Sequence, residues 1–211
     1  MAKTTDDISV LVEYLSRCFL EYIDEGTIDF CEYDVIDINV DNQKRICSIC
    51  PSYYIEGYSV VKAFDLYEYL GYNNFVDFIK SSEKLLTAFS NMVAVDFLMA
   101  NTDRHLDNYA FYMDNQTGEL VDMVPLYDFN YSFIADILDT NVSETMCQTL
   151  NDGRTMLEVL KEFIQFADID FKTEVIAECF IEQAYALNPA IAIGVKDRFK
   201  ILKEIGFNLL K

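Results

Sequence analysis

The chain has 211 residues, of which 52% are hydrophobic and 25% are charged, and its formal net charge is -20 at pH 7. This hydrophobic content excludes a disordered chain, and the length allows one substantial domain, or two, with a hydrophobic core. The negative charge argues against direct binding to nucleic acid or to anionic membranes, because both depend on cationic side chains.

Six cysteines are spread along apolar runs, and the N-terminal sequence is polar and acidic, unlike a signal peptide. This pattern predicts free, buried thiols in a reducing cytoplasm. Cys47 and Cys50 have the spacing of half a zinc knuckle, but no second Cys or His pair follows at the required distance, so we expect a strand there. No apolar run reaches the ~20 residues that span a bilayer, and we expect no membrane anchor.

The first predicted element is an amphipathic helix over Asp6–Asp24, because its apolar residues recur every three or four positions. Thr5 or Asp6 can cap its first turn, and Gly26 can end it. Glu13 lies on the polar face of this helix, where a surface glutamate is expected.

Two extended segments follow the helix and are predicted to form strands. They cover Asp29–Val40 and Arg45–Tyr54, and turn-forming residues at 41–44 join them. Residues 55–59 are predicted to be a short linker into the rest of the chain.

The next part of the sequence is predicted to be mostly helical. Residues Ala63–Lys80 indicate a helix, a turn at Gly71 and the asparagines after it, and a second short helix. A longer helix runs from Ser82, which can cap it, to about Ala100, and its apolar stripe is typical of a central core helix. The rest of the chain is predicted to be a helical tail, with helices over Thr155–Phe166, Lys172–Leu187 and Ile193–Ile205.

The central helix is followed by polar residues in the order that a phosphoryl-transfer site needs. Asp103 precedes Asn108 by five positions, and two short strands over Tyr109–Met113 and Leu120–Val124 then lead back to Asp128. In protein kinases such an Asp orients the acceptor hydroxyl, while the Asn and the second Asp hold Mg²⁺. Taken singly these would be ordinary loop residues, but their joint order and spacing favour a shared site.

Two strings carry a family resemblance: NTDRHLDNYAF, residues 101–111, and PLYDFN, residues 125–130. They resemble the catalytic and metal-binding elements of the HipA-like kinase family and, less closely, those of phosphatidylinositol kinases. The resemblance implies an α+β, protein-kinase-like fold. Residues 1–58 would form a partial N-lobe with a helix, two strands and a hinge, and residues 59–211 a mostly helical C-lobe with the catalytic loop and metal-binding element.

The resemblance also implies an ATP- and Mg²⁺-dependent protein serine/threonine kinase. In such an enzyme Asp103 would deprotonate the acceptor hydroxyl, and Asn108 and Asp128 would hold Mg²⁺. Cys50 would lie at the hinge that meets the adenine of ATP, and Glu13 would be the acid that pairs with a nucleotide-binding lysine.

Arg104 and His105 complete the set of candidate catalytic residues beside Asp103. Arg104 either binds phosphate or pairs with a nearby acid. His105 either carries a proton or hydrogen-bonds loop carbonyls and holds Asp103, and we favour the second role because no orienting partner is visible. Asp107 stands where several relatives carry a basic residue. Asn130 replaces the glycine of an ordinary kinase, and asparagine tolerates a left-handed backbone in this turn.

Two parts of a complete kinase are missing from the sequence. None of the seven glycines lies within two residues of another, so there is no Gly-rich loop, and no lysine-bearing strand precedes the first helix. The missing half-lobe would be on a separate chain, removed from the sequence, or lost in a degenerate relative.

Three functions therefore remain open. The first is a kinase that acts on a protein substrate, and the second is a catalytically inactive kinase-like module that pairs with another protein chain. A Mg²⁺-dependent hydrolase that uses Asp103 and Asp128 is a third, which the kinase spacing disfavours. Family members often act in toxin–antitoxin pairs with a DNA-binding partner, so the resemblance implies a protein substrate or regulatory partner chain.

Overall fold

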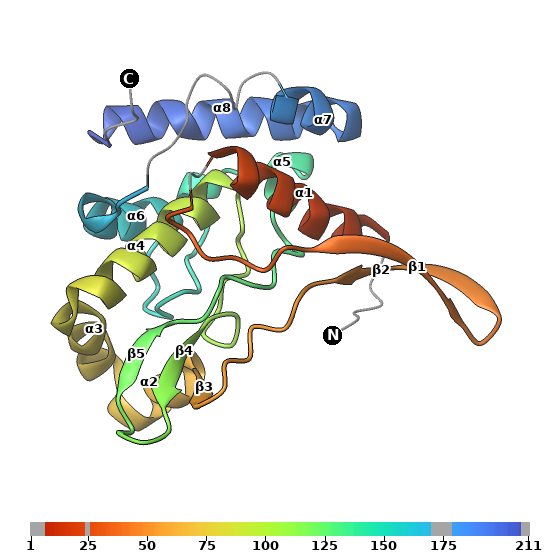
Figure 1. Cartoon of the computed structure of the whole chain (residues 1–211). Helices are drawn as coiled ribbons and strands as arrows, with labels where there is room; N and C mark the ends of the chain where they lie inside the picture. The colour runs from red at the N-terminus through yellow and green to blue at the C-terminus, as the bar shows by residue number, and fades with distance from the viewer. Residues whose placement is uncertain (1–6, 24–25, 170–178, 208–211) are drawn as a thin grey trace.

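The computed structural model describes residues 7–23, 26–169 and 179–207, and Figure 1 shows its mixed α+β architecture. One antiparallel sheet is the hairpin of β1 (Asp34–Val40) and β2 (Gln43–Ile49), which projects from the body of the molecule. The other sheet has the order β3-β4-β5 and contains β3 (Tyr58–Lys62), β4 (Ala110–Asp114) and β5 (Leu120–Met123).

Helices make up most of the body. In Figure 1 the C-terminal helices lie across the end of the body opposite the β3-β4-β5 sheet, and α4 runs between them and the sheet. The helices are α1 (Asp7–Ile23), α2 (Ala63–Leu70), α3 (Tyr72–Ser81), α4 (Glu83–Leu98), α5 (Ile134–Ile137), α6 (Met156–Phe163), α7 (Cys179–Leu187) and α8 (Pro189–Glu204), with 3-10 turns η1 (Val142–Glu144) and η2 (Ile164–Phe166).

Helix α1 packs one side of its predicted polar face against β2. Glu13 is only 1% exposed, and the Ser48 hydroxyl donates a hydrogen bond to its carboxylate. The expectation of a surface glutamate is wrong, because β2 covers this side of the helix. Arg17 joins the same helix to β1, with Nη1 2.5 Å from Asp34 Oδ1.

The predicted pair of strands is confirmed, with a tighter turn and a later start, but the second strand ends at Ile49 and not at Tyr54. Asp41 and Asn42 have φ values of 52° and 61°, the left-handed values that suit a two-residue hairpin turn. Residues 29–33 do not belong to the hairpin but run beside the segment before Asp128. The Cys31 amide, for example, donates to the Leu126 carbonyl at 2.8 Å.

The prediction of a linker over residues 55–59 is wrong at its end, because Tyr58 already belongs to β3. This strand pairs antiparallel with β4, with Tyr58 opposite Asp114 and Lys62 opposite Ala110. A five-residue strand has little signal of its own and forms because a partner far along the sequence pairs with it.

The predicted helices are largely confirmed, and their ends explain two differences. Gly71, with φ 76°, separates α2 from α3, but the asparagines after it lie inside α3. Helix α4 begins after Ser82, whose hydroxyl accepts a backbone hydrogen bond in the first turn. Helix α8 begins at Pro189 and not at Ile193, because Asn188 caps it and proline suits the first turn.

Four further predictions concern the whole chain or residues at the limits of the described ranges. The caps at Thr5 and Asp6 lie outside them, as does the first part of the predicted helix Lys172–Leu187, of which α7 is the described part. No helix within these ranges is long and apolar enough to cross a membrane. The thiol prediction holds for Cys18, Cys31 and Cys147, which are buried and form no disulfide.

The main hydrophobic core surrounds α4, and a hydrogen bond fixes the C-terminal end of this helix. Phe89, near the middle of α4, packs edge-on against Phe163 of α6, with ring centroids 4.9 Å apart. At the C-terminal end, Arg198 Nε of α8 donates to the Leu98 carbonyl at 2.8 Å. The loop that follows α4 therefore starts from a fixed position.

Candidate active site

The loop after α4 is built around a buried ion pair. The side chains of Arg104 and Asp96 are 1% and 2% exposed, and Arg104 Nε lies 2.9 Å from Asp96 Oδ2. Asn101 donates a further hydrogen bond to Asp96 at 2.9 Å. Burial opposes the charge of Arg104, but the Asp96 carboxylate outweighs it and raises the pKa of the guanidinium. Burial also raises the pKa of Asp96, and the contacts with Arg104 and Asn101 oppose this rise. The hydrogen-bonded pair holds the loop against the last turns of α4.

The remaining donors of Arg104 reach two other segments. Nη1 donates to the Asn108 carbonyl at 2.6 Å and also to the Tyr127 carbonyl. The guanidinium lies over the Phe129 ring, with Cζ 5.0 Å from the ring centroid. Because Tyr127 directly precedes Asp128, one nitrogen atom holds the Asn108 and Asp128 segments side by side. Of the two roles expected for Arg104, the structure contains the pairing with an acid.

Asp103 and Asn108 are joined directly. Asn108 Nδ2 donates to the Asp103 backbone carbonyl at 2.9 Å, which leaves the amide oxygen as the group that a cation would bind. Asn108 is 5% exposed, whereas Asp103 is partly exposed. The Asp103 carboxylate accepts a long hydrogen bond from Gln148 Nε2 at 3.4 Å.

His105 closes the loop between these two residues. Its backbone amide donates to the Asp103 carbonyl at 2.8 Å, and its own carbonyl accepts from the Asn108 amide at 2.9 Å. Its ring Nδ1 accepts from the Asp107 amide at 3.2 Å. These contacts suit a residue that shapes the loop.

Asp107 is paired with a lysine from another strand. Lys62, the last residue of β3, places Nζ 2.9 Å from Asp107 Oδ1. The hydrogen bond to Asp107 raises the pKa of Lys62. The negative charge beside Asn108 is therefore balanced locally, although both side chains remain about half exposed.

Asp128 occupies an unusual backbone position. Its φ of 60° is left-handed, and its amide donates to the Tyr33 hydroxyl at 3.1 Å. Burial raises the pKa of Tyr33 far above its ordinary value, so this hydroxyl stays neutral. Asn130 was the residue expected to take the left-handed conformation, but the turn uses Asp128 instead. Phe129 is fully buried beneath the site.

The predicted hinge segment reaches the site through a tyrosine. Tyr53 stacks on Tyr127, with ring centroids 5.7 Å apart and an interplanar angle of 11°. Cys50 is half-buried and lies beside the thiol of Cys31. Burial, with a smaller effect from Cys50, raises the pKa of Cys31 to about 12. The described contact of Cys50 is thus with Cys31.

A known protein family matches the part of the sequence that contains this site. A sequence model of the HipA-like C-terminal domain matches residues 49–191, which is more than half of the chain. The chain belongs to the HipA-like C-terminal domain family. This match covers the candidate catalytic loop and the segment around Asp128. A search of curated proteins finds no match.

Solved structures resemble the whole HipA-like chain. The proinflammatory kinase CtkA of Helicobacter pylori has a TM-score of 0.56 at 15% identity, over 97% of this chain and 86% of CtkA. HipA of Shewanella oneidensis MR-1, in a complex with HipB and operator DNA, has a TM-score of 0.48 at 12% identity, over 97% of this chain and 55% of HipA. The similarity to CtkA confirms the α+β, kinase-like fold.

Several residues that shape this HipA-like site are not evident from the sequence. Asp96, Gln148 and Tyr33 contact Arg104, Asp103 and the Asp128 amide respectively. Asp96 alone carries a usable signal, because a carboxylate within an apolar core helix needs a partner. Gln148 and Tyr33 lie 45 and 95 residues from the positions they contact, and nothing local in the sequence marks them.

Proposed function

We propose that this chain is a HipA-like protein kinase that transfers the γ-phosphate of ATP to a serine or threonine hydroxyl of another protein. The observation that carries the proposal is the position of Arg104, which hydrogen-bonds the carbonyls of Asn108 and Tyr127. These bonds keep the oxygen ligands of Asn108 and Asp128 in neighbouring segments. Asp103 lies beside these ligands because the Asn108 side chain donates a hydrogen bond to the Asp103 backbone carbonyl.

Each residue has one role in the proposed reaction. Asp103 accepts a hydrogen bond from the acceptor hydroxyl and takes its proton as the hydroxyl oxygen attacks the γ-phosphorus of ATP. The bond between this phosphorus and the bridging oxygen breaks, and ADP leaves. The amide oxygen of Asn108 and the carboxylate of Asp128 would hold Mg²⁺. Bound Mg²⁺–ATP supplies the phosphoryl group and the neutralisation of its charge. The chain contributes chiefly by holding these groups in position.

The donor set fits magnesium. Mg²⁺ in phosphoryl-transfer sites uses one or two side-chain oxygens, and phosphate oxygens and water complete its coordination. Asn108 and Asp128 provide such a pair. Within the described ranges, no group of three or more His, Cys, Asp or Glu side chains could form a closed metal site.

Fewer residues are candidates for binding the nucleotide. Glu13 is buried beside Ser48, and the segment with Cys50 and Tyr53 is the candidate hinge for adenine. No two glycines within these 211 residues lie close enough to form the Gly-rich loop that covers the phosphates in a kinase, and a kinase also needs a nucleotide-binding lysine. If the chain is a kinase, we propose that another segment or chain supplies them. The lack of a Gly-rich loop within these residues is the observation that favours the second candidate, a catalytically inactive module that pairs with another protein.

Transfer of labelled γ-phosphate from Mg²⁺–ATP to protein acceptors separates the two candidates. We expect wild-type activity, alone or with an added lysine-bearing N-lobe fragment, and a fall of about 10²–10⁴-fold in Asp103→Ala and Asp128→Ala. Asp77→Ala, which removes an exposed acid of α3, is the matched control and should retain activity. If no transfer and no thermal stabilisation by Mg²⁺–ATP occur under either condition, the inactive module is the better description.

A further inference from the structure

Residues 145–149, here called the acceptor ledge, lie beside the catalytic loop, and Met146 forms an isolated antiparallel bridge with Thr155. The side chains of the ledge alternate between the interior and the surface. Cys147 and Thr149 are buried, whereas Met146 and Gln148 are exposed. This alternation places Met146 and Gln148 on the surface side of the ledge.

The backbone of the ledge is held from two sides. The Cys147 amide donates to the Arg154 carbonyl at 2.8 Å, and the buried Tyr109 hydroxyl donates to the Thr149 carbonyl at 2.7 Å. Tyr109 directly follows Asn108 in the sequence. The ledge is therefore attached to the catalytic loop as well as to the segment that follows the ledge.

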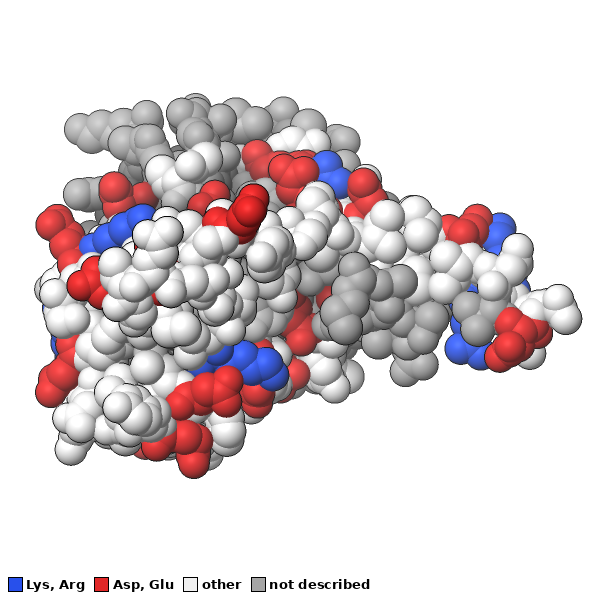
Figure 2. Space-filling view, turned by 60° about the horizontal axis from the view of Figure 1, so that its bottom comes forward, with Lys and Arg blue, Asp and Glu red and all other residues white. Residues whose placement is uncertain are grey.

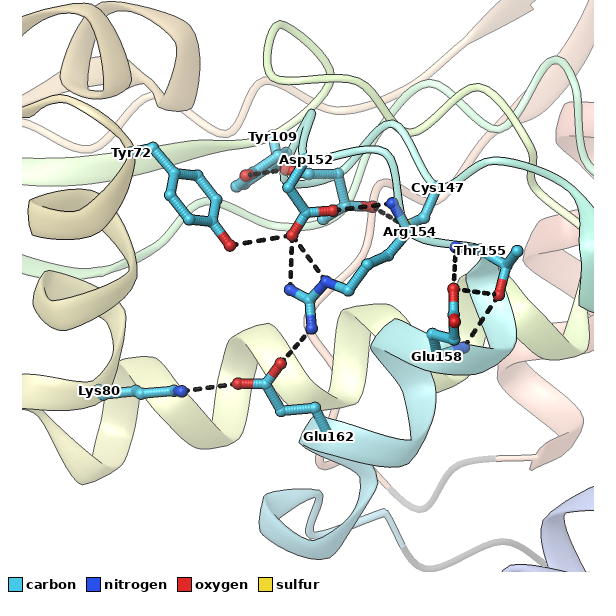
Figure 3. Close-up of polar contacts among 10 residues, drawn as sticks. Tyr72, Lys80, Tyr109, Cys147, Asp152, Arg154, Thr155, Glu158 and Glu162 are labelled. Atoms are coloured by element: carbon cyan, nitrogen blue, oxygen red, sulfur yellow. Dashed lines mark hydrogen bonds and ion pairs between the residues drawn. The ribbon is translucent and has the colours of Figure 1, made fainter.

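A polar network fixes that following segment, as Figure 3 shows. Arg154 lies 2.6 Å from Asp152 and also contacts Glu162 of α6. Lys80 of α3 bonds the same Glu162 at 2.6 Å, and the Tyr72 hydroxyl donates to Asp152 at 2.9 Å. Hydrogen bonds therefore tie two helices to the residues beside the ledge, which limits its movement.

Gln148 uses this fixed position to contact Asp103. Its Nε2 donates to the Thr102 carbonyl at 3.0 Å and to Asp103 Oδ1 at 3.4 Å. The first bond orients the amide, and the second restrains one oxygen of the carboxylate. The other carboxylate oxygen, Oδ2, is then the one available to an acceptor hydroxyl.

We propose that Gln148 is a positioning residue for Asp103 and that the acceptor ledge is the surface on which the acceptor protein lies. Met146 is 64% exposed on the face of Gln148, so it contacts an apolar side chain of the acceptor close to the target hydroxyl. The acceptor is thus a polypeptide with an apolar residue near its serine or threonine. This inference rests on the proposed kinase function.

The contribution of Gln148 is tested by steady-state kinetics with the full chain under the conditions that support transfer. Gln148→Ala should lower kcat by about tenfold and leave the KM for ATP unchanged, because the carboxylate loses its fixed orientation while the nucleotide contacts remain. Gln148→Glu should lower kcat further, because a second carboxylate faces Asp103. Gln116→Ala, in the exposed turn of β4 and β5, is the control. An unchanged kcat in Gln148→Ala overturns the role of Gln148.

The contribution of Met146 has a different kinetic signature. Met146→Ala should raise the KM for a protein acceptor by about three- to tenfold with little effect on kcat, because it removes apolar contact area and leaves Asp103 in place. Leu187→Ala removes a similarly exposed apolar side chain from the end of α7 and should change neither constant. An acceptor KM that is the same in Met146→Ala and in the wild type excludes the ledge as the acceptor surface.

The contact itself can be observed without turnover. In the ¹⁵N–¹H spectrum of the full chain, the side-chain amide signal of Gln148 should shift in Asp103→Asn and stay in place in Asp77→Asn. If the Gln148 signal has the same position in Asp103→Asn and in the wild type, the contact is absent and the proposal is overturned. A wild-type chain that never transfers phosphate overturns the ledge role together with the kinase function, whereas an active chain with full turnover in Gln148→Ala overturns the role of Gln148 alone.

Discussion

The body around the catalytic loop and the projecting β1-β2 hairpin hold their charged side chains in opposite ways. In the body, the side chains of Arg104 and Asp96 are 1% and 2% exposed and bond three separate segments. In the hairpin, Lys44 and Asp37 lie 2.8 Å apart but are 71% and 57% exposed. Both positively and negatively charged side chains lie on the surface at the end of the hairpin (Figure 2). The buried pair fixes the positions of the segments around the site. The exposed pair forms where the hairpin backbone already places its two side chains and contributes little to the fold.

Removal of Arg104 should produce the largest loss of stability. Arg104→Met leaves the Asp96 carboxylate buried without its cation and leaves two buried carbonyls without their donor. The free energy of unfolding should fall by about 3–5 kcal/mol, measured by urea denaturation. A change below about 1 kcal/mol would show that water or another donor replaces the guanidinium.

The double variant Asp96→Leu/Arg104→Met separates stability from site geometry. It removes the uncompensated buried charge, so it should recover much of the stability that Arg104→Met loses. It cannot restore the bonds to the Asn108 and Tyr127 carbonyls, and phosphoryl transfer should remain low. Recovery of transfer in the double variant would contradict the anchoring role of Arg104.

The second prediction concerns Cys31, where the N-terminal part of the chain meets the segment before Asp128. Its pKa is about 12 in the fold, mainly because of burial, against an ordinary value near 9. The folded state therefore favours the neutral thiol. The resulting stability is fully present below about pH 9 and is lost as the pH rises to about 12.

Chemical denaturation at several pH values measures this effect. Three pKa units correspond to roughly 4 kcal/mol at most, so the unfolding free energy of the wild type should fall more steeply than that of Cys31→Ala above pH 9. Equal slopes in the two proteins would assign the loss to other groups. At pH 8 the folded protein should also leave Cys31 unmodified by iodoacetamide, because few thiolates form.

The sequence allowed the loop after α4 and the hairpin that follows it to be located, because the signals there are local. Asp103, Asn108 and Asp128 stand at fixed spacings, and a short hairpin connects the last two. The partners of these residues could not be predicted in the same way. Tyr33 and Gln148 reach the site only after strands and helices far along the chain have packed together.

The same distinction explains which parts of the fold were predicted correctly. The helix α4 has a strong apolar period and a cap at Ser82, so its position follows from neighbouring residues. Strand β3 and the burial of Glu13 depend on contacts with β4 and β2, which a single sequence does not reveal. Periodicity places Glu13 on a polar face, but it cannot show that another strand covers this face.

The third prediction extends the comparison to a second buried ion pair. Arg198 of α8 lies 2.5 Å from Asp136, both side chains are 5% exposed, and the same guanidinium bonds the Leu98 carbonyl. Gly194 lies against this pair, and a Cβ there would stand 2.0 Å from Asp136 Oδ1. Gly194→Ala should therefore lower the unfolding free energy by about 1–3 kcal/mol, although alanine is the better helix former.

Helix α8 contains no second glycine, so the exposed residue directly before Gly194 provides the control. Ile193→Ala shortens an exposed side chain of the same helix turn and should change stability by less than about 0.5 kcal/mol. Thermal or urea denaturation of the two variants can be compared directly. A Gly194→Ala variant as stable as the wild type would mean that Asp136 can move away without losing Arg198.

The smallest effect is expected in the hairpin. Lys44→Ala should change the unfolding free energy by less than about 0.5 kcal/mol, because water screens its contact with Asp37 and solvates both groups after separation. Urea denaturation at low and high salt should give the same small difference. If Lys44→Ala instead destabilises the fold as strongly as Gly194→Ala, the hairpin charges also determine the fold, and the contrast with the catalytic-loop region no longer holds.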